Sequence, residues 1–268
     1  MATQNRPTNL SYGVSPSQFI YIHYPTATNV PCPLVFFIHG GFWKSRYGID
    51  PPTAACETIA PDLQQHGFIC AEIEYRRSED SPWGWPHTNH DVLTAYKTVL
   101  DHASHSVRTS KVIVVGHSAG GTLALWLGAQ LVKEHFPVLP AYIYALAPVA
   151  DLRMAVRMRL SDDGDAVQRY MHGTPKHIPG EYDKACPTAL ATHLACLNIR
   201  LVAGSADTDV PPSLAKRLCN CVRDAAVFED RARGSLVLDV FTRAAHYDMV
   251  NAGSAVWTQL RDSMKRIP

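Results

Sequence analysis

The sequence lacks several features that would place it outside the ordinary class of globular proteins. No uninterrupted apolar stretch approaches the roughly 20 residues of a membrane span, and no apolar signal segment follows the polar residues 1–7. Its 25 lysines and arginines are balanced by 24 aspartates and glutamates, so no global field attracts nucleic acid or an anionic membrane. We therefore expect a cytoplasmic protein that binds a small-molecule substrate, with no nucleic acid and no membrane as partner. The spacing of residues does not determine the oligomeric state, and a homodimer is one alternative.

The sequence also lacks a pattern typical of disulfides or zinc. Its seven cysteines are an odd number, and no two of them have CxxC spacing. Such a set fits reduced thiols in a reducing compartment. The closely spaced histidine pairs, at positions 87 and 90 and at 102 and 105, have no acidic or thiol partners that would complete a metal site. We expect neither a metal nor another cofactor.

Apolar runs of strand length alternate along the chain with amphipathic helical stretches. The expected strands are 18–24, 34–38, 68–75, 112–115, 142–146, 199–203 and 236–241, and the expected helices are 52–65, 90–105, 122–134, 213–222 and 255–265. This alternation predicts an α/β fold, a mostly parallel sheet with helices on both faces. Residues 151–193, rich in charge, glycine and proline, interrupt it and predict a lid over the mouth of the site. Residues 1–268 would then form one domain that carries this lid.

A serine bounded by glycines follows the apolar run 112–115. Residues 116–121 read Gly-His-Ser-Ala-Gly-Gly, with glycine two positions before and two positions after Ser118. A nucleophile elbow needs this spacing, because its turn is so tight that larger residues would collide. Ser118 is thus the expected nucleophile. The backbone N–H of Ala119, at the start of the next helix, is an expected oxyanion donor.

A second glycine-containing loop follows the apolar run 34–38. Residues 39–43 read His-Gly-Gly-Phe-Trp, which predicts an oxyanion-hole loop. Backbone N–H groups of Gly41 and Phe42, with Gly40 as the other candidate, would bind the charge that forms on the substrate oxygen.

A serine nucleophile needs a base, and in this arrangement the partners follow in the order Ser, Asp or Glu, His, each just after a strand. Asp207 follows the expected strand 199–203 and is the expected acid, with Asp209 as the fallback. His246 lies between the last expected strand and the last expected helix, and is the expected base.

Three large aromatic residues follow expected strand ends. Trp43, Tyr75 and Trp85 are therefore candidates for substrate binding. The alternative interpretation is that they pack in the core, as large aromatic side chains often do.

From about Ser17 onward the chain resembles an α/β-hydrolase. Residues 39–43 are similar to the HGG-aromatic-Trp loop of kynurenine formamidases (arylformamidases) and their esterase relatives, with weaker likeness at residues 84–86 and 246–248. The resemblance implies Ser118 as nucleophile, Asp207 as orienting acid and His246 as base, with residues 40–41 in the oxyanion loop. Phe42 stands where members of that family often have tyrosine, and residues 151–193 carry no family signature.

The resemblance implies a serine hydrolase that converts N-formylkynurenine to kynurenine and formate in tryptophan degradation. A carboxylesterase acting on short-chain or aromatic esters is the alternative, because the same acyl-enzyme chemistry serves both reactions. A third hypothesis is a hydrolase-fold protein that binds without catalysis. A peptidase is less favoured, since the chain has no room for a large domain that would filter peptides.

Overall fold

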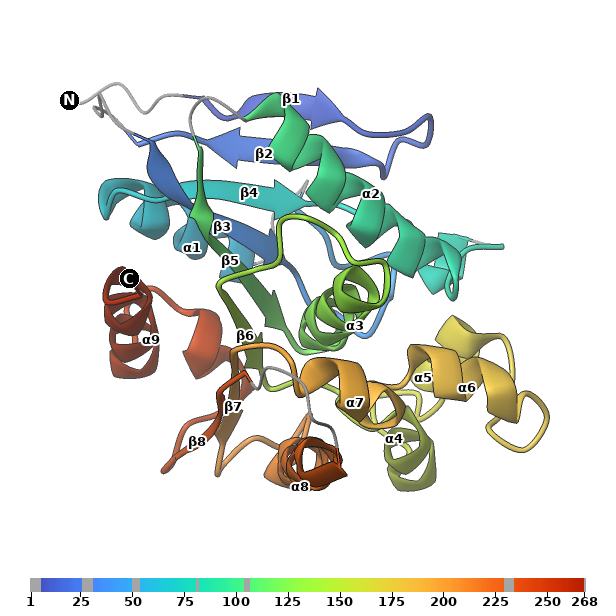
Figure 1. The fold of residues 1–268 in the computed structure, drawn as a ribbon. Coiled ribbons are helices and arrows are strands. Elements are labelled where there is room, and N and C mark those ends of the chain that lie inside the picture. The colour runs from blue at the N-terminus through green and yellow to red at the C-terminus, as the bar shows by residue number, and fades with distance from the viewer. Residues whose placement is uncertain are drawn as a thin grey trace.

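An eight-stranded sheet forms the centre of the molecule (Figure 1). The computed structural model describes residues 6–25, 31–49, 54–80, 82–103, 107–228 and 234–267. The strands are β1 (Thr8–Ser11), β2 (Phe19–His23), β3 (Cys32–Ile38), β4 (Ile69–Ile73), β5 (Val107–His117), β6 (Tyr142–Leu146), β7 (Ile199–Gly204) and β8 (Leu236–Phe241). They lie in the order β1-β2-β4-β3-β5-β6-β7-β8.

The sheet is parallel from β4 through β8, and β1 and β2 join it antiparallel at one edge. The central strand β3 is apolar along most of its length because both of its faces are covered. Its residues Val35 and Phe37 face one core cluster, while Leu34, Phe36 and Ile38 face the other. The expected α/β-hydrolase fold is confirmed.

Helices cover both faces of the sheet (Figure 1). Helices α1 (Ala54–Gln65) and α9 (Ala255–Lys265) supply apolar side chains to the cluster that contains Val35. Helices α2 (His87–His102), α3 (Ala119–Lys133) and α8 (Pro212–Phe228) supply the cluster that contains Phe36. Short 3-10 turns at Ser78–Asp80 (η1) and His246–Val250 (η3) complete this framework.

The segment for which we predicted a lid lies between β6 and β7. It contains α4 (Leu152–Met158), α5 (Ala166–Met171), α6 (Pro179–Ala185), η2 (Pro187–Leu190) and α7 (Ala191–Leu194). Tyr170 and Tyr182 are fully buried and belong to the same core cluster as α2 and α3. The segment is therefore anchored in the core, and its role as a lid stays a prediction.

Most expected elements are present, with shifted ends. Strand β1 has a polar sequence and was not expected; it pairs with β2 through its backbone. Helix α3 begins directly after Ser118, three residues before the expected start, because Gly120 and Gly121 pack their backbone against neighbouring segments. Expected helix residues 52–53 and 104–105 lie outside the described residues. Within the described part of the chain, no helix combines the length and apolarity that crossing a membrane requires.

Gly120 offers a test of how tightly these elements meet. A Cβ at this position would collide with the carbonyl oxygens of Ile38 and His39, whereas one at Gly180, an exposed residue of α6, would meet no atom within 4 Å. We expect Gly120→Ala to lower the free energy of unfolding by about 2 kcal/mol or more. Gly180→Ala should leave it unchanged or raise it by about 0.5 kcal/mol. Urea denaturation measures both, and equal effects would contradict the close approach.

Candidate active site

The expected nucleophile lies in a sharp turn between β5 and α3. Ser118 has φ 55° and ψ −120°, a left-handed conformation that is strained for a residue with a side chain. A Cβ on Gly116 would strike the carbonyl oxygen of Gly120, and a Cβ on Gly120 would strike that of Ile38. The turn also donates a backbone hydrogen bond from Ser118 N to Leu146 O, at 2.8 Å. The glycines therefore have the steric role that the sequence predicted.

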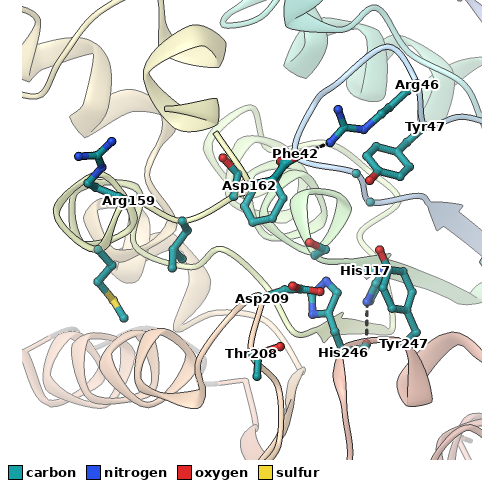
Figure 2. Close-up of a pocket in the computed structure, with 16 residues that line it drawn as sticks. Phe42, Arg46, Tyr47, His117, Arg159, Asp162, Thr208, Asp209, His246 and Tyr247 are labelled. Carbon is teal, nitrogen blue, oxygen red and sulfur yellow. Dashed lines mark hydrogen bonds and ion pairs between the residues drawn. The ribbon is translucent and has the colours of Figure 1, made fainter. Parts of the chain in front are cut away.

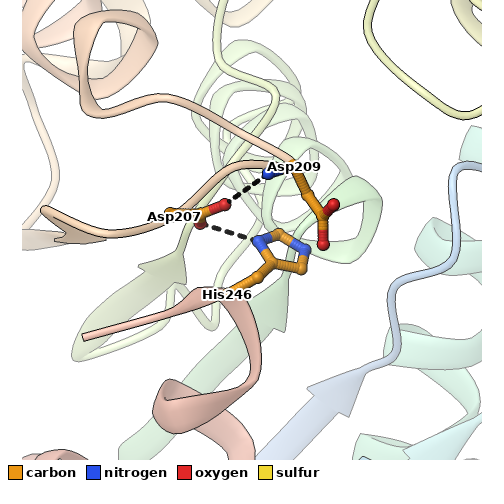
Figure 3. Close-up of side chains that lie close together, drawn as sticks. All are labelled: Asp207, Asp209 and His246. Carbon is orange, nitrogen blue, oxygen red and sulfur yellow. Dashed lines mark hydrogen bonds and ion pairs between the residues drawn. The ribbon is translucent and has the colours of Figure 1, made fainter. Parts of the chain in front are cut away.

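The expected base and acid form a buried pair. His246 Nδ1 lies 2.7 Å from Asp207 Oδ2 (Figure 3). The other carboxylate oxygen, Oδ1, accepts backbone hydrogen bonds from Asp209 at 2.9 Å and from Val210 at 2.8 Å. Because a carboxylate accepts, Nδ1 carries the proton and Nε2 is left as the basic nitrogen.

Asp209, the fallback acid, has a different position. It is exposed, and among the described residues its carboxylate makes no hydrogen bond to His246. Asp207, Asp209 and His246 offer ligand atoms that all lie within 4.8 Å of one another, as a metal site would require. Both oxygens of Asp207 already accept N–H bonds, however, so this cluster is better suited to orienting an imidazole than to holding a cation.

The loop after β3 brings backbone donors to the serine. A Cβ on Gly40 would lie 2.9 Å from Ser118 Cβ, so the loop runs directly against the nucleophile. Gly41, Phe42 and Trp43 have φ values of 111°, 49° and 57°, which turn the backbone sharply. Among the residues that the structure describes, nothing accepts a hydrogen bond from the N–H groups of Gly41 and Phe42. These donors are free to bind a developing oxyanion.

Buried polar contacts hold the start of this loop in place. His39 Nε2 lies 3.2 Å from Glu74 Oε1, and the His39 ring stacks on Tyr75 with centroids 4.4 Å apart. The Tyr75 hydroxyl donates to the carbonyl oxygen of His39 at 2.9 Å. Burial by itself would raise the pKa of Glu74, but His39, Arg77 and the backbone N–H of Ile49 together hold it below its usual value. The loop is thus anchored by a charged carboxylate.

Ser118 and His246 open onto one cavity of about 850 Å³ (Figure 2). Its lining comes from five parts of the chain: Gly40, Gly41, Phe42, Arg46 and Tyr47; His117 and Ser118; Met158, Arg159, Leu160, Ser161 and Asp162; Thr208 and Asp209; His246 and Tyr247. Among the described residues no hydrogen bond joins the Ser118 hydroxyl to His246. Such bonds often tighten only when substrate is bound. The structure therefore brings Ser118, His246 and the loop residues Gly40, Gly41 and Phe42 together around one volume.

The three predicted aromatic residues do not line this cavity. Trp43 and Tyr75 are fully buried, and Trp85 is 8% exposed. Trp43 stacks on Tyr170 with ring centroids 4.1 Å apart, and Trp85 donates to Glu181 Oε2 at 2.8 Å. Their surroundings match the alternative interpretation, packing within the fold.

Three other aromatic residues line the cavity instead. Phe42, Tyr47 and Tyr247 line it. Tyr247 directly follows His246, and Tyr47 lies four positions after Trp43, so proximity to the motifs was the one signal in the sequence.

An ion cluster links two walls of the cavity. Lys44, which is almost fully buried, pairs with Asp162 and with Asp163, the latter at 2.6 Å. Arg46 also pairs with Asp162, as Figure 2 shows. Lys44 and Arg46 hold the pKa of Asp162 well below its usual range, chiefly through these hydrogen bonds. The cluster therefore ties the loop between α4 and α5 to the loop after β3, beside the site.

The pairing at His246 distinguishes the two candidate acids. We expect Asp207→Asn to lower kcat by about 10⁴-fold, because the amide no longer holds the imidazole in the required tautomer. Asp209→Asn, at an exposed carboxylate on the same loop, should change kcat by less than about tenfold. Steady-state hydrolysis of p-nitrophenyl acetate measures both variants. The reverse ranking would make Asp209 the acid.

His117, the residue before Ser118, should make the stability of the protein depend on pH. Burial first, and then the neighbouring His246, lower the pKa of His117 well below the ordinary histidine value. Below about pH 6.5 the unfolded chain then binds a proton that the folded chain does not, so stability falls as pH drops, by about 1.4 kcal/mol per pH unit. Urea denaturation at about pH 7.5 and about pH 5.5 should show a larger loss in the wild type than in His117→Gln. Equal losses would mean that His117 is charged in the folded protein.

Comparisons with known proteins agree with this geometry. A family model described as BD-FAE matches residues 20–221. The chain is 35% identical over 143 residues to the non-reducing polyketide synthase Preu6 of Preussia isomera, a match that covers 48% of this chain and 6% of that protein. It is 27% identical over 122 residues to the kynurenine formamidase of Salmo salar, which covers 43% of this chain and 36% of that protein.

The ethyl acetate hydrolase of Pseudomonas putida is 26% identical over 118 residues, which covers 44% of this chain and 35% of that protein. The matches therefore span at most 36% of the length of these relatives.

Solved structures share the whole fold. Esterase B from Lactobacillus Rhamnosis has a TM-score of 0.77 at 17% identity, and the match covers 98% of this chain and 84% of that one. A truncated carbohydrate esterase from gut microbiota has a TM-score of 0.76 at 17% identity, with 98% and 97% covered. The chain therefore belongs to the BD-FAE family and has the α/β-hydrolase fold.

Proposed function

We propose that the protein is a carboxylesterase that cleaves short-chain or aromatic esters through a serine acyl-enzyme. The observation that carries the proposal is the pairing of His246 with Asp207 beside a cavity that Ser118, Gly41 and Phe42 also line. Two of the relatives and neighbours reported above are named as esterases, and one as an ethyl acetate hydrolase. These names favour ester cleavage over formamide cleavage.

In the proposed reaction the Ser118 hydroxyl attacks the ester carbonyl carbon while His246 Nε2 takes its proton. Asp207 keeps the imidazole oriented and stabilises its positive charge. The tetrahedral oxyanion accepts hydrogen bonds from the N–H of Ala119, at the N-terminus of α3, and from Gly41 and Phe42. His246 then returns the proton to the departing alcohol, which leaves an acyl group on Ser118. Water activated by His246 releases the acid and restores the serine.

The cavity suits a small-molecule substrate. Its volume of about 850 Å³ lies within the usual range for such pockets, about 300–1,000 Å³. The rings of Phe42, Tyr47 and Tyr247 on its walls would pack against an aromatic acyl or alcohol group. A short acyl chain would fill only part of this space.

Hydrolysis of N-formylkynurenine is the second candidate. The specific observation in its favour is the loop at residues 39–43, together with the formamidase of Salmo salar among the relatives. That match covers 43% of this chain at 27% identity, so it supports the shared chemistry more than the shared substrate.

A comparison of two substrates tests the choice. We expect kcat/KM for p-nitrophenyl acetate to exceed that for N-formylkynurenine by about 100-fold or more, because a phenolate leaves an acyl carbon more readily than an aromatic amine does. A preference of similar size for N-formylkynurenine would make the protein an arylformamidase.

Ser118→Ala serves as the control for the nucleophile. It should abolish turnover of both substrates and labelling by a fluorophosphonate, while its circular dichroism spectrum stays that of the wild type. A wild-type protein that neither turns over substrate nor reacts with the probe would instead support the non-catalytic hypothesis.

A further inference from the structure

We propose that His117 is a positioning residue for the reaction: its ring nitrogen holds the backbone of His246 and so fixes the place of the base. This inference rests on the proposed function. His117 lies directly before the nucleophile at the end of β5, and it lines the cavity without taking part in the proton transfers described above.

The contact that carries the proposal joins distant parts of the chain. His117 Nε2 lies 3.0 Å from the carbonyl oxygen of His246, and this hydrogen bond is buried (Figure 2). A carbonyl oxygen accepts, so Nε2–H is the donor. The bond ties the first residue of η3 to the end of β5, the strand that also ends at Ser118. It therefore sets the distance between nucleophile and base from the backbone side.

The His117 ring also contacts two parts of the site, the His246 ring and the loop that contains Gly40. Its centroid lies 4.5 Å from that of the His246 ring, at an interplanar angle of 47°. On the other side, a Cβ placed on Gly40 would lie 3.1 Å from His117 Nδ1, so the ring packs against the oxyanion loop. One buried side chain thus contacts the loop that carries the base and the loop that carries the oxyanion donors.

A neutral side chain is needed in this place. His246 gains a positive charge each time it takes the serine proton, and a second cation 4.5 Å away would oppose that step. His117 is 3% exposed, and its burial favours the uncharged ring. It can therefore donate one hydrogen bond to His246 without repelling the imidazolium.

Two substitutions separate positioning from simple packing. His117→Gln keeps an N–H donor at a similar reach, whereas His117→Leu has a similar volume and no donor. We expect His117→Leu to lower kcat for p-nitrophenyl acetate by about 10- to 100-fold, with KM changed by less than about threefold, because a displaced base slows the chemical step. His117→Gln should recover most of the lost rate. The matched control is His23→Leu. His23 is a partly buried histidine outside the cavity lining, and its Nε2 lies 3.0 Å from Glu72 Oε2.

A double-mutant cycle tests whether His117 acts through His246. The rate of fluorophosphonate labelling should fall about 10-fold or more in His117→Leu, and the same change made in His246→Ala should lower it by less than about twofold. Equal factors in both backgrounds would overturn the proposal. So would a His117→Leu variant as active as His117→Gln.

A spectroscopic readout keeps the inference independent of turnover. The proton of the His246–Asp207 hydrogen bond should give a low-field ¹H NMR signal that His117→Gln retains and His117→Leu shifts or loses. A wild type inert toward esters and fluorophosphonate would end the proposed function, yet this signal would still decide whether His117 positions His246. An unchanged signal in a folded His117→Leu variant would overturn the inference.

Discussion

The whole site depends on one steric constraint, the left-handed backbone of Ser118 between β5 and α3. Holding a non-glycine residue in such a conformation costs about 1–3 kcal/mol and requires surroundings that leave no alternative. Those surroundings are the contacts of Gly116 with Gly120 and of Gly120 with the end of β3. The same contacts bring the N-terminus of α3 and the loop after β3 to the serine. Packing of the backbone therefore places the proposed nucleophile and the proposed oxyanion donors together.

The opposite half of the site is assembled by a second close approach. A Cβ on Gly204 would collide with the carbonyl oxygen of Ala244, so the loops after β7 and β8 can lie together only because this residue is glycine. Ala206 N donates to the same oxygen at 3.0 Å. This arrangement puts Asp207 beside His246, and the backbone N–H groups of Asp209 and Val210 hold the carboxylate in its orientation. His117 then links this half to the first.

One wall of the cavity comes from outside the sheet and the loops that follow its strands. Residues 158–162 approach from the helical segment between β6 and β7, and Lys44 and Arg46 hold them there through Asp162 and Asp163. Tyr170 and Tyr182 anchor the rest of that segment in the core. The proposed catalytic residues thus lie at the ends of the strands, whereas the proposed substrate wall is built mainly from loops. This division fits a fold that supports one chemistry with many substrates.

The fold class, the proposed nucleophile with its glycines, and the chain order of the proposed acid and base could all be predicted from the sequence. These features depend on the alternation of apolar residues and on the steric needs of tight turns, which neighbouring residues carry. The packing of the folded chain pairs Asp207 with His246, buries Trp43, Tyr75 and Trp85 away from the cavity, and brings His117 to His246. Each of these outcomes is set by a few ångströms between loops far apart in the chain. Local patterns do not encode such distances, because they arise from the packing of the whole sheet.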